Sequence, residues 1–158
     1  MTAGLVWIRI AVTCTVAGGL VALTRPGGPE ALWPTPDRVL VGVATGLALF
    51  WVVARIAPPL SPPLLAVLVL AAGAEEVIWR WFVLGELLAA AGTAAALLAS
   101  ACAFGAVHPG RRVLHTGTGL AFGAVYVLTG SLLAAWGAHG AYNVCVAVAA
   151  RHAPPETA

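Results

Sequence analysis

The sequence has very little charge. Its 158 residues include eight basic residues, all of them arginine, and six acidic ones, so that 9% of the chain is charged and 61% is apolar. A typical soluble domain has about a quarter of its residues charged, and a disordered chain combines low hydrophobicity with high charge. Both classes are excluded at a mean hydropathy of +0.96. The composition predicts a protein whose solvent is largely lipid.

Cysteine is also scarce. Cys14, Cys102 and Cys145 lie far apart in apolar runs and form no C-x-x-C pattern, so we expect small buried core residues. A cleavable secretory signal is not expected either. The first apolar run has no basic residue before Leu5, contains Arg9, and is followed by further apolar runs rather than by a polar sequence.

Long apolar runs separated by breakers predict an all-α, polytopic membrane bundle with about six transmembrane helices. The first run, residues 5–24, is long enough to cross a hydrocarbon core of about 30 Å. Gly92 and the triplet 129–131 divide the two longest stretches into helix pairs. The expected helices cover about residues 5–24, 39–57, 64–91, 94–107, 113–128 and 132–150. The pairs Gly42/Gly46 and Gly119/Gly123 favour close helix packing.

The chain divides into three expected parts. Residues 1–63 hold two N-terminal transmembrane helices joined by a Pro/Gly-rich loop, residues 64–150 form an intramembrane core, and residues 151–158 form a short cytoplasmic tail. With six spans, four loop arginines share one side of the membrane with both termini, against two on the other side. By the positive-inside rule, both termini are expected in the cytoplasm.

Polar groups inside a span cost several kcal/mol unless they are paired or face water, so each is a hypothesis about function. Six stand out: Glu75, Glu76, Arg80, His108, His139 and Asn143. Glu76 and Arg80 are four residues apart and can neutralise each other on one helix face. Glu75 points about 100° away. Either the three form a structural ion pair with a spare acid, or Glu76 and Arg80 are a brace and Glu75 is the working carboxylate.

The histidines repeat the four-residue spacing. Phe104 and His108 share a helix face, and Pro109 makes His108 a predicted helix end. His139 and Asn143 share a face of the last helix. Taken alone, His108 is consistent with a helix cap, and the second pair with hydrogen bonding between helices.

Depth along the helices brings these groups together. A turn at Gly92 puts Glu75 and His108 at one level on antiparallel helices. Glu75 then lies about 16 Å below one surface and His139 about 12 Å below the other, and these depths nearly coincide in a core of about 30 Å. We therefore expect Glu75, His108 and His139 to face one water-filled cavity.

Three motifs in this order on successive hydrophobic helices resemble a known family. They are Glu75-Glu76-x-x-x-Arg80, Phe104-x-x-x-His108 and His139-x-x-x-Asn143. They are similar to those of the CAAX prenyl protease and bacteriocin-processing (CPBP, Abi) intramembrane endopeptidases, over about residues 64–150. The resemblance implies that Glu75 activates water with help from His108, and that His139 and Asn143 stabilise the oxyanion. Supporting roles are implied for Glu76, Arg80 and Phe104.

A metal is not favoured, although members of the family are often called metalloproteases. Zinc is possible, with Glu75, His108 and His139 as ligands, but the chain lacks H-E-x-x-H. A glutamate-activated water needs no metal, and Asn143 is a poor zinc ligand. The expected partners are a peptide or membrane-protein substrate and the lipid bilayer, with no nucleic acid.

Two other functions stay open: a catalytically silent immunity or scaffold protein of the same fold, and a small transporter.

We expect the protein to be an integral protein of a bacterial cytoplasmic membrane. His115 and His152 have no helix-spaced partner that can be named as catalytic, and they receive no catalytic role. Glu86 is expected at the noncytoplasmic interface or in the cavity. The tryptophans near span ends are expected to anchor the protein at the interface: Trp7, Trp33 and Trp51.

Overall fold

Every regular element of the structure, a computed structural model, is helical within the residues that it describes, 3–23, 36–53, 65–108 and 110–152. The elements are α1 (Ala3–Leu23), α2 (Pro36–Val53), α3 (Leu65–Glu76), the π-helix η2 (Val77–Leu84), α4 (Gly85–Ala91), α5 (Thr93–Ala106), α6 (Arg112–Thr129) and α7 (Leu132–His152). Because α3, η2 and α4 follow one another without a break, the described residues form six helical rods. The all-α prediction is confirmed.

The predicted turns lie where the glycines indicated. Gly92, with φ +75°, separates α4 from α5, and Gly130, with φ +61°, ends α6 in the left-handed conformation that glycine adopts at little cost. The helix α2 begins three residues earlier than expected, at Pro36, because proline fits the first turn of a helix. Most of the predicted loop at 25–38 and of the tail at 151–158 falls outside the described residues.

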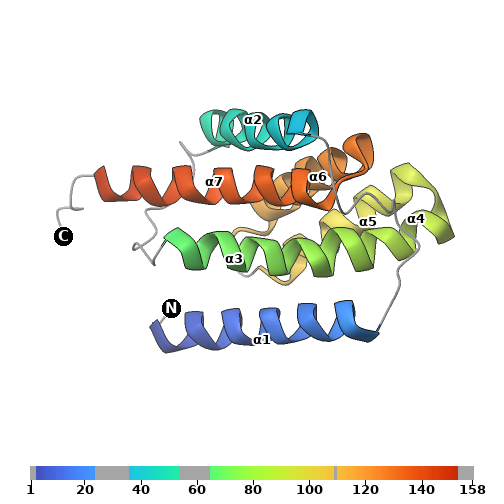
Figure 1. Cartoon of the computed structure of the whole chain (residues 1–158), viewed down its shortest axis with the longest axis horizontal. Helices are drawn as coiled ribbons and strands as arrows, with labels where there is room; N and C mark the ends of the chain where they lie inside the picture. The colour runs from blue at the N-terminus through green and yellow to red at the C-terminus, as the bar shows by residue number, and fades with distance from the viewer. Residues whose placement is uncertain (1–2, 24–35, 54–64, 109, 153–158) are drawn as a thin grey trace.

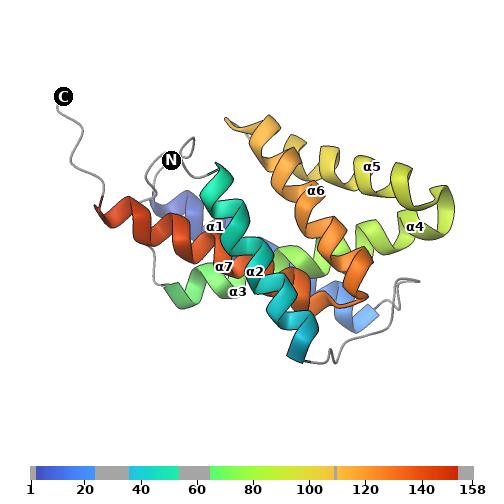
Figure 2. The same ribbon diagram turned by 90° about the horizontal axis from the view of Figure 1, so that it is seen from above.

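The helix α7 lies at the centre of the bundle (Figure 1), with α2 along one side and α3 along the other. The helix α1 packs against the far side of α3 and η2. Viewed from above (Figure 2), α5 and α6 form an antiparallel pair beside this stack. Contacts with η2 bring α3, α5 and α7, which carry the other motif residues, next to one another.

Glycine sets the spacing between α2 and α7. A Cβ atom at Gly42 or Gly46 would collide with the carbonyl oxygen of Ala134 or Ala138 on α7. The predicted close packing of this small-xxx-small pair is confirmed, and the backbones of the two helices are in direct contact.

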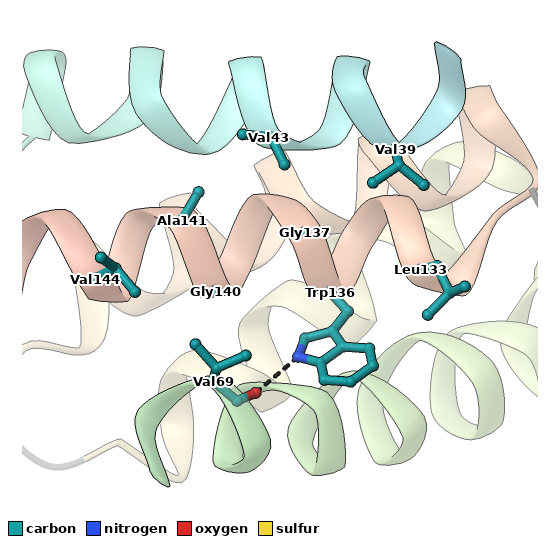
Figure 3. A pocket seen from close by; sticks show the side chains of 9 residues that line it. All are labelled: Val39, Val43, Val69, Leu133, Trp136, Gly137, Gly140, Ala141 and Val144. Atoms are coloured by element: carbon teal, nitrogen blue, oxygen red, sulfur yellow. Dashed lines mark hydrogen bonds between the residues drawn. The ribbon is translucent and has the colours of Figure 1, made fainter. Parts of the chain in front are cut away.

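On another face of α7, small residues leave an apolar groove between α2 and α3, which we call the α2–α3 groove (Figure 3). Val43 of α2 and Gly137 and Gly140 of α7 line this groove, whose volume is about 390 Å³. The Trp136 indole N–H donates a 2.7 Å hydrogen bond to the Val69 carbonyl oxygen, which ties α7 to α3 across it.

The bundle buries polar groups within its apolar core and exposes large apolar side chains. Its interior buries seven polar or charged residues: Glu76, Arg80, Ser100, His108, Thr118, Ser131 and His139. Its surface exposes large apolar side chains on every helical rod, among them Ile8, Leu40, Leu70, Leu98, Val113 and Val148. Exposed apolar side chains on every rod are compatible with a membrane environment.

By length and hydropathy, one helix of the described chain qualifies as a membrane span, over Leu132–Ala149. The apolar helices Ile10–Leu23 and Thr93–Ala106 are shorter. The predicted number of helices is confirmed by the six helical rods of the described residues. Of these rods, only α7 meets the length and hydropathy criterion for a membrane span.

The expectation for the cysteines is wrong. Cys14 and Cys102 are exposed, and Cys145 is only half-buried, because these positions fall on helix faces that point away from the polar interior. Trp7 and Trp51 are exposed, at 52% and 73%, as an interfacial anchor requires, whereas Trp33 lies outside the described residues.

Candidate active site

The most deeply buried polar group is an ion cluster at the junction of α3 and η2. Glu76 and Arg80 have no exposed side-chain surface, and Arg80 Nε lies 3.0 Å from Glu76 Oε2. The other carboxylate oxygen, Oε1, lies 2.8 Å from His139 Nδ1 on α7. Since a carboxylate only accepts hydrogen bonds when ionised, the Nδ1–H of His139 is the donor. Glu76 therefore links α3, η2 and α7.

Two aromatic rings enclose the guanidinium. The Cζ atom of Arg80 lies 5.0 Å from the ring centroid of Phe104 and 5.8 Å from that of Phe122. Within the described chain, the Nη1 and Nη2 atoms of Arg80 have no hydrogen-bond partner, so the aromatic faces supply the compensating attraction. We call Glu76, Arg80, the Nδ1 edge of His139 and these two rings the closed side of the site.

Glu75 lies on the neighbouring face of the same turn, about 100° around the helix from Glu76. Its carboxylate is 17% exposed, and its two oxygens lie 3.9 Å from Nε2 of His108 and 3.9 Å from Nε2 of His139. Both distances exceed a direct hydrogen bond. Glu75, His108 and the Nε2 edge of His139 form what we call the open side.

The orientation of His108 is fixed from the backbone. Its Nδ1 lies 2.6 Å from the Phe104 carbonyl oxygen, and because a carbonyl can only accept, Nδ1 carries the proton. The Phe104 ring packs against the imidazole with centroids 4.4 Å apart. In the neutral ring, Nε2 then presents its lone pair toward Glu75. The predicted helix end is also confirmed, since α5 stops at Ala106.

The π-helical segment begins directly after the two glutamates. The Gly85 amide donates to the Arg80 carbonyl five residues earlier, which is the π-helical pattern. Such segments are rare and occur frequently at functional sites. Here the wider turn carries Arg80 while the glutamates remain on the regular α3 helix.

A cavity of about 230 Å³ opens at the open side. Glu75 and His108 line it, together with residues of α1 and η2. Asn143 lies one turn beyond His139 on α7 and is half-buried.

The structure thus brings together most of the predicted set. Glu76 pairs with Arg80, Phe104 packs on His108, and Glu75 faces both histidines. The convergence expected from helix depth is confirmed for Glu75 and the two imidazoles, although His139 does not line the cavity. Glu86 is exposed in the first turn of α4 and does not line the cavity at Glu75.

Two neighbours of the histidines were missed. His115 of α6 stacks on His108 with centroids 4.4 Å apart and an interplanar angle of 30°. Phe122 stacks on His139 at 4.7 Å and 18°. A signal was available, because His115, Gly119 and Phe122 are spaced i, i+4 and i+7 and so share one face of α6. Gly119 lets the Phe104 ring approach, since a Cβ there would lie 2.9 Å from its Cδ1.

The site was also tested as a metal centre. Zinc is held by nitrogen and oxygen ligands at about 2.0–2.2 Å. Among the described side chains, no group of three or more His, Cys, Asp or Glu is arranged to hold a metal ion. Glu75 presents a different oxygen to each imidazole, at 3.9 Å in both cases.

A helical bundle with an apolar exterior and a carboxylate between two oriented imidazoles belongs to the class of membrane proteins that carry a buried polar site. The family model described as Type II CAAX prenyl endopeptidase Rce1-like matches residues 57–145, more than half of the chain and all three motifs. The protein belongs to this family of membrane peptidases. Comparison with curated proteins and with solved structures gives no match.

Proposed function

We propose that the protein is an intramembrane endopeptidase in which Glu75 activates water for attack on a peptide bond. The observation that carries the proposal is the placement of the Glu75 carboxylate, 3.9 Å from Nε2 of both His108 and His139. A water molecule that bonds to two groups at about 2.8 Å each bridges such a separation at an angle of about 90°. The substrate is a peptide or a membrane protein.

His108 positions the water. With its Nδ1–H donated to the Phe104 carbonyl, its Nε2 accepts one water hydrogen while Glu75 accepts the other. As the water oxygen bonds to the carbonyl carbon, Glu75 takes its proton. Collapse of the tetrahedral intermediate breaks the C–N bond, and the proton passes from Glu75 to the leaving amine. A base of this kind contributes about 10²–10⁴ in rate.

His139 donates a hydrogen bond to the oxyanion of the tetrahedral intermediate. This role requires a proton on Nε2 of His139 as well as on Nδ1. Its Nδ1–H is held by Glu76 at 2.8 Å, so the Nε2–H is free to donate where charge develops on the carbonyl oxygen. The Asn143 amide, one turn along α7, is the second donor. Fixed donors of this type stabilise the transition state without reorganisation.

The finer topology is part of the proposal. The protein has six spans, expected from the apolar runs, in a bacterial cytoplasmic membrane, and the arginine distribution supports both termini in the cytoplasm. The core that performs the chemistry is residues 64–150, which agrees closely with the family match at 57–145.

The test is cleavage of a fluorogenic peptide library by purified protein in detergent or lipid, with Glu75→Gln compared against wild type. The amide keeps the shape of the side chain but cannot take a proton from water. We expect cleavage by wild type and a loss of at least about 100-fold in the variant. Equal cleavage by both proteins would remove Glu75 from the mechanism, and no cleavage by either would favour the silent scaffold.

A further inference from the structure

Another, larger cavity lies where α6 begins, and the proposed peptidase chemistry does not use it. It measures about 920 Å³ and is lined by Leu49 of α2, by Gly110 and Arg111, and by residues of α6 from Arg112 to Thr118. The C-terminal end of α2 and the start of α6, which border it, both lie along the upper edge of the bundle in Figure 2. We call it the α2–α6 cavity.

The lining of the α2–α6 cavity is positively charged. Arg111 is half-buried and Arg112 is exposed, and both line the cavity. None of the described residues in its lining is acidic. A guanidinium presents several N–H donors in one plane, which match the oxygens of a phosphate group. The charged part of the cavity therefore favours a phosphate-bearing anion.

Apolar residues follow the arginines directly. Val113 and Leu114 come next along α6, and Leu49 of α2 adds a third apolar side chain to the lining. Val113 is 89% exposed, the highest value among the large apolar residues that the structure describes. A free phosphate has no apolar part and would leave these side chains uncovered. The lining as a whole therefore favours an amphipathic anion.

The order of these groups matches the order of groups in a phospholipid. In the proposed topology, the two arginines lie at the cytoplasmic surface and α6 runs from them into the membrane. A phospholipid likewise has its phosphate at the surface and its acyl chains below it, and arginines beside a membrane surface attract anionic lipids. Ligand sites span about 300–1,000 Å³, so the cavity is large enough for a headgroup and part of an acyl chain.

We propose that the α2–α6 cavity binds one anionic phospholipid, whose phosphate is held by Arg111 and Arg112 and whose acyl chain lies along the apolar lining. The inference goes beyond the proposed peptidase function and does not depend on it. Each arginine is expected to contribute about 5-fold to the affinity for an anionic lipid.

The experiment uses the full chain in detergent and compares phosphatidylglycerol with phosphatidylcholine of the same acyl chains. Native mass spectrometry measures the lipid bound as each lipid is added. We expect wild type to bind phosphatidylglycerol at least about 10-fold more tightly, and the double variant Arg111→Gln/Arg112→Gln to lose this preference. Because a ligand that binds the folded state stabilises it, phosphatidylglycerol should also raise the unfolding midpoint of wild type but not that of the double variant.

Arg38→Gln is the matched control, because Arg38 is an exposed arginine in the first turn of α2 and does not line the cavity. It should keep the wild-type preference. If the double variant does not fold, Arg112→Gln alone, at an exposed position, should lower the affinity for phosphatidylglycerol about 5-fold.

Three outcomes would overturn the lipid site. The first is equal affinity of wild type for the two lipids, and the second is an equal loss of preference in Arg38→Gln. The third is displacement of phosphatidylglycerol by millimolar inorganic phosphate or by an acidic peptide, which would assign the arginines to a different anion. Since no measurement requires peptide cleavage, the test holds even if the proposed peptidase function fails.

Discussion

Glu75 and Glu76 are adjacent in the chain, yet the two sides of the helix on which they lie differ in almost every physical respect. On the closed side, Glu76 has no exposed surface and both of its oxygens are engaged, one by Arg80 at 3.0 Å and one by His139 at 2.8 Å. On the open side, Glu75 retains 17% exposure, lines a cavity, and stands 3.9 Å from each imidazole.

Under the proposed function, this difference separates a structural carboxylate from a catalytic one on adjacent residues of the same helix. A carboxylate whose oxygens are both held at contact distance is a fixed charge that orients its partners. A carboxylate held at the distance of one bridging molecule can exchange a proton with that molecule. His139 belongs to both sides, because its Nδ1 contacts Glu76 and its Nε2 faces Glu75, so the closed side orients a group that the open side uses.

The largest expected effect is a loss of stability when the ion pair of the closed side is broken. Arg80→Met leaves the Glu76 charge buried without its cation, and loss of one partner of a buried pair costs about 3–5 kcal/mol in the free energy of unfolding. Denaturant unfolding in detergent measures it. Arg112→Met, at an exposed position at the start of α6, is the control and should change stability by less than about 0.5 kcal/mol. Equal stability losses in the two variants would contradict the assignment.

The next largest effect is expected on kcat, when a proposed oxyanion donor is removed. Asn143→Ala should lower kcat by about 10²–10³-fold with little change in KM, because the interaction forms in the transition state. Steady-state kinetics on a cleaved peptide measure kcat and KM separately. Cys145→Ala, two residues away on α7 and half-buried, should keep wild-type kinetics. A rise in KM without a fall in kcat would assign Asn143 to substrate binding instead.

A smaller effect is expected at His115, whose ring stacks on His108. Such ring contacts contribute about 0.5–1.5 kcal/mol, so His115→Leu should lower kcat by up to about 10-fold by loosening His108. His115→Phe keeps a flat ring and should retain most of the rate. If the phenylalanine variant is as slow as the leucine variant, the stacking account is wrong and the imidazole itself is required.

Removal of metal ions is expected to have no effect on kcat/KM. Because the described side chains are not arranged as a metal site, treatment with a chelator followed by dialysis should leave kcat/KM unchanged. Metal content is measured on the same sample. Loss of activity that zinc restores would replace the glutamate-water mechanism with a metal-dependent one.

Much of this arrangement could be predicted from the sequence, for identifiable reasons. Apolar runs and breakers gave the helices, and Gly92 gave the turn that brings Glu75 level with His108. The four-residue spacing of Glu76 and Arg80 sufficed for their ion pair because both lie on one continuous helical rod.

The rest depended on how helices rotate against one another, which spacing within one helix does not determine. The contact of His139 with Glu76 and the stacking of His115 on His108 both join separate helices. The π-helix after Glu76 had no sequence signal that we could recognise. The cysteines were misplaced for a related reason, since in an apolar bundle a small apolar residue faces outward as readily as inward.

The most direct test of the central claim measures kcat/KM and the unfolding midpoint together for Glu75→Gln and Glu76→Gln in one detergent. The account predicts that Glu75→Gln loses at least about 100-fold in kcat/KM at the wild-type unfolding midpoint, while Glu76→Gln unfolds more readily. A Glu75→Gln protein that still cleaves at the wild-type rate, or that loses activity only because it unfolds, would contradict it.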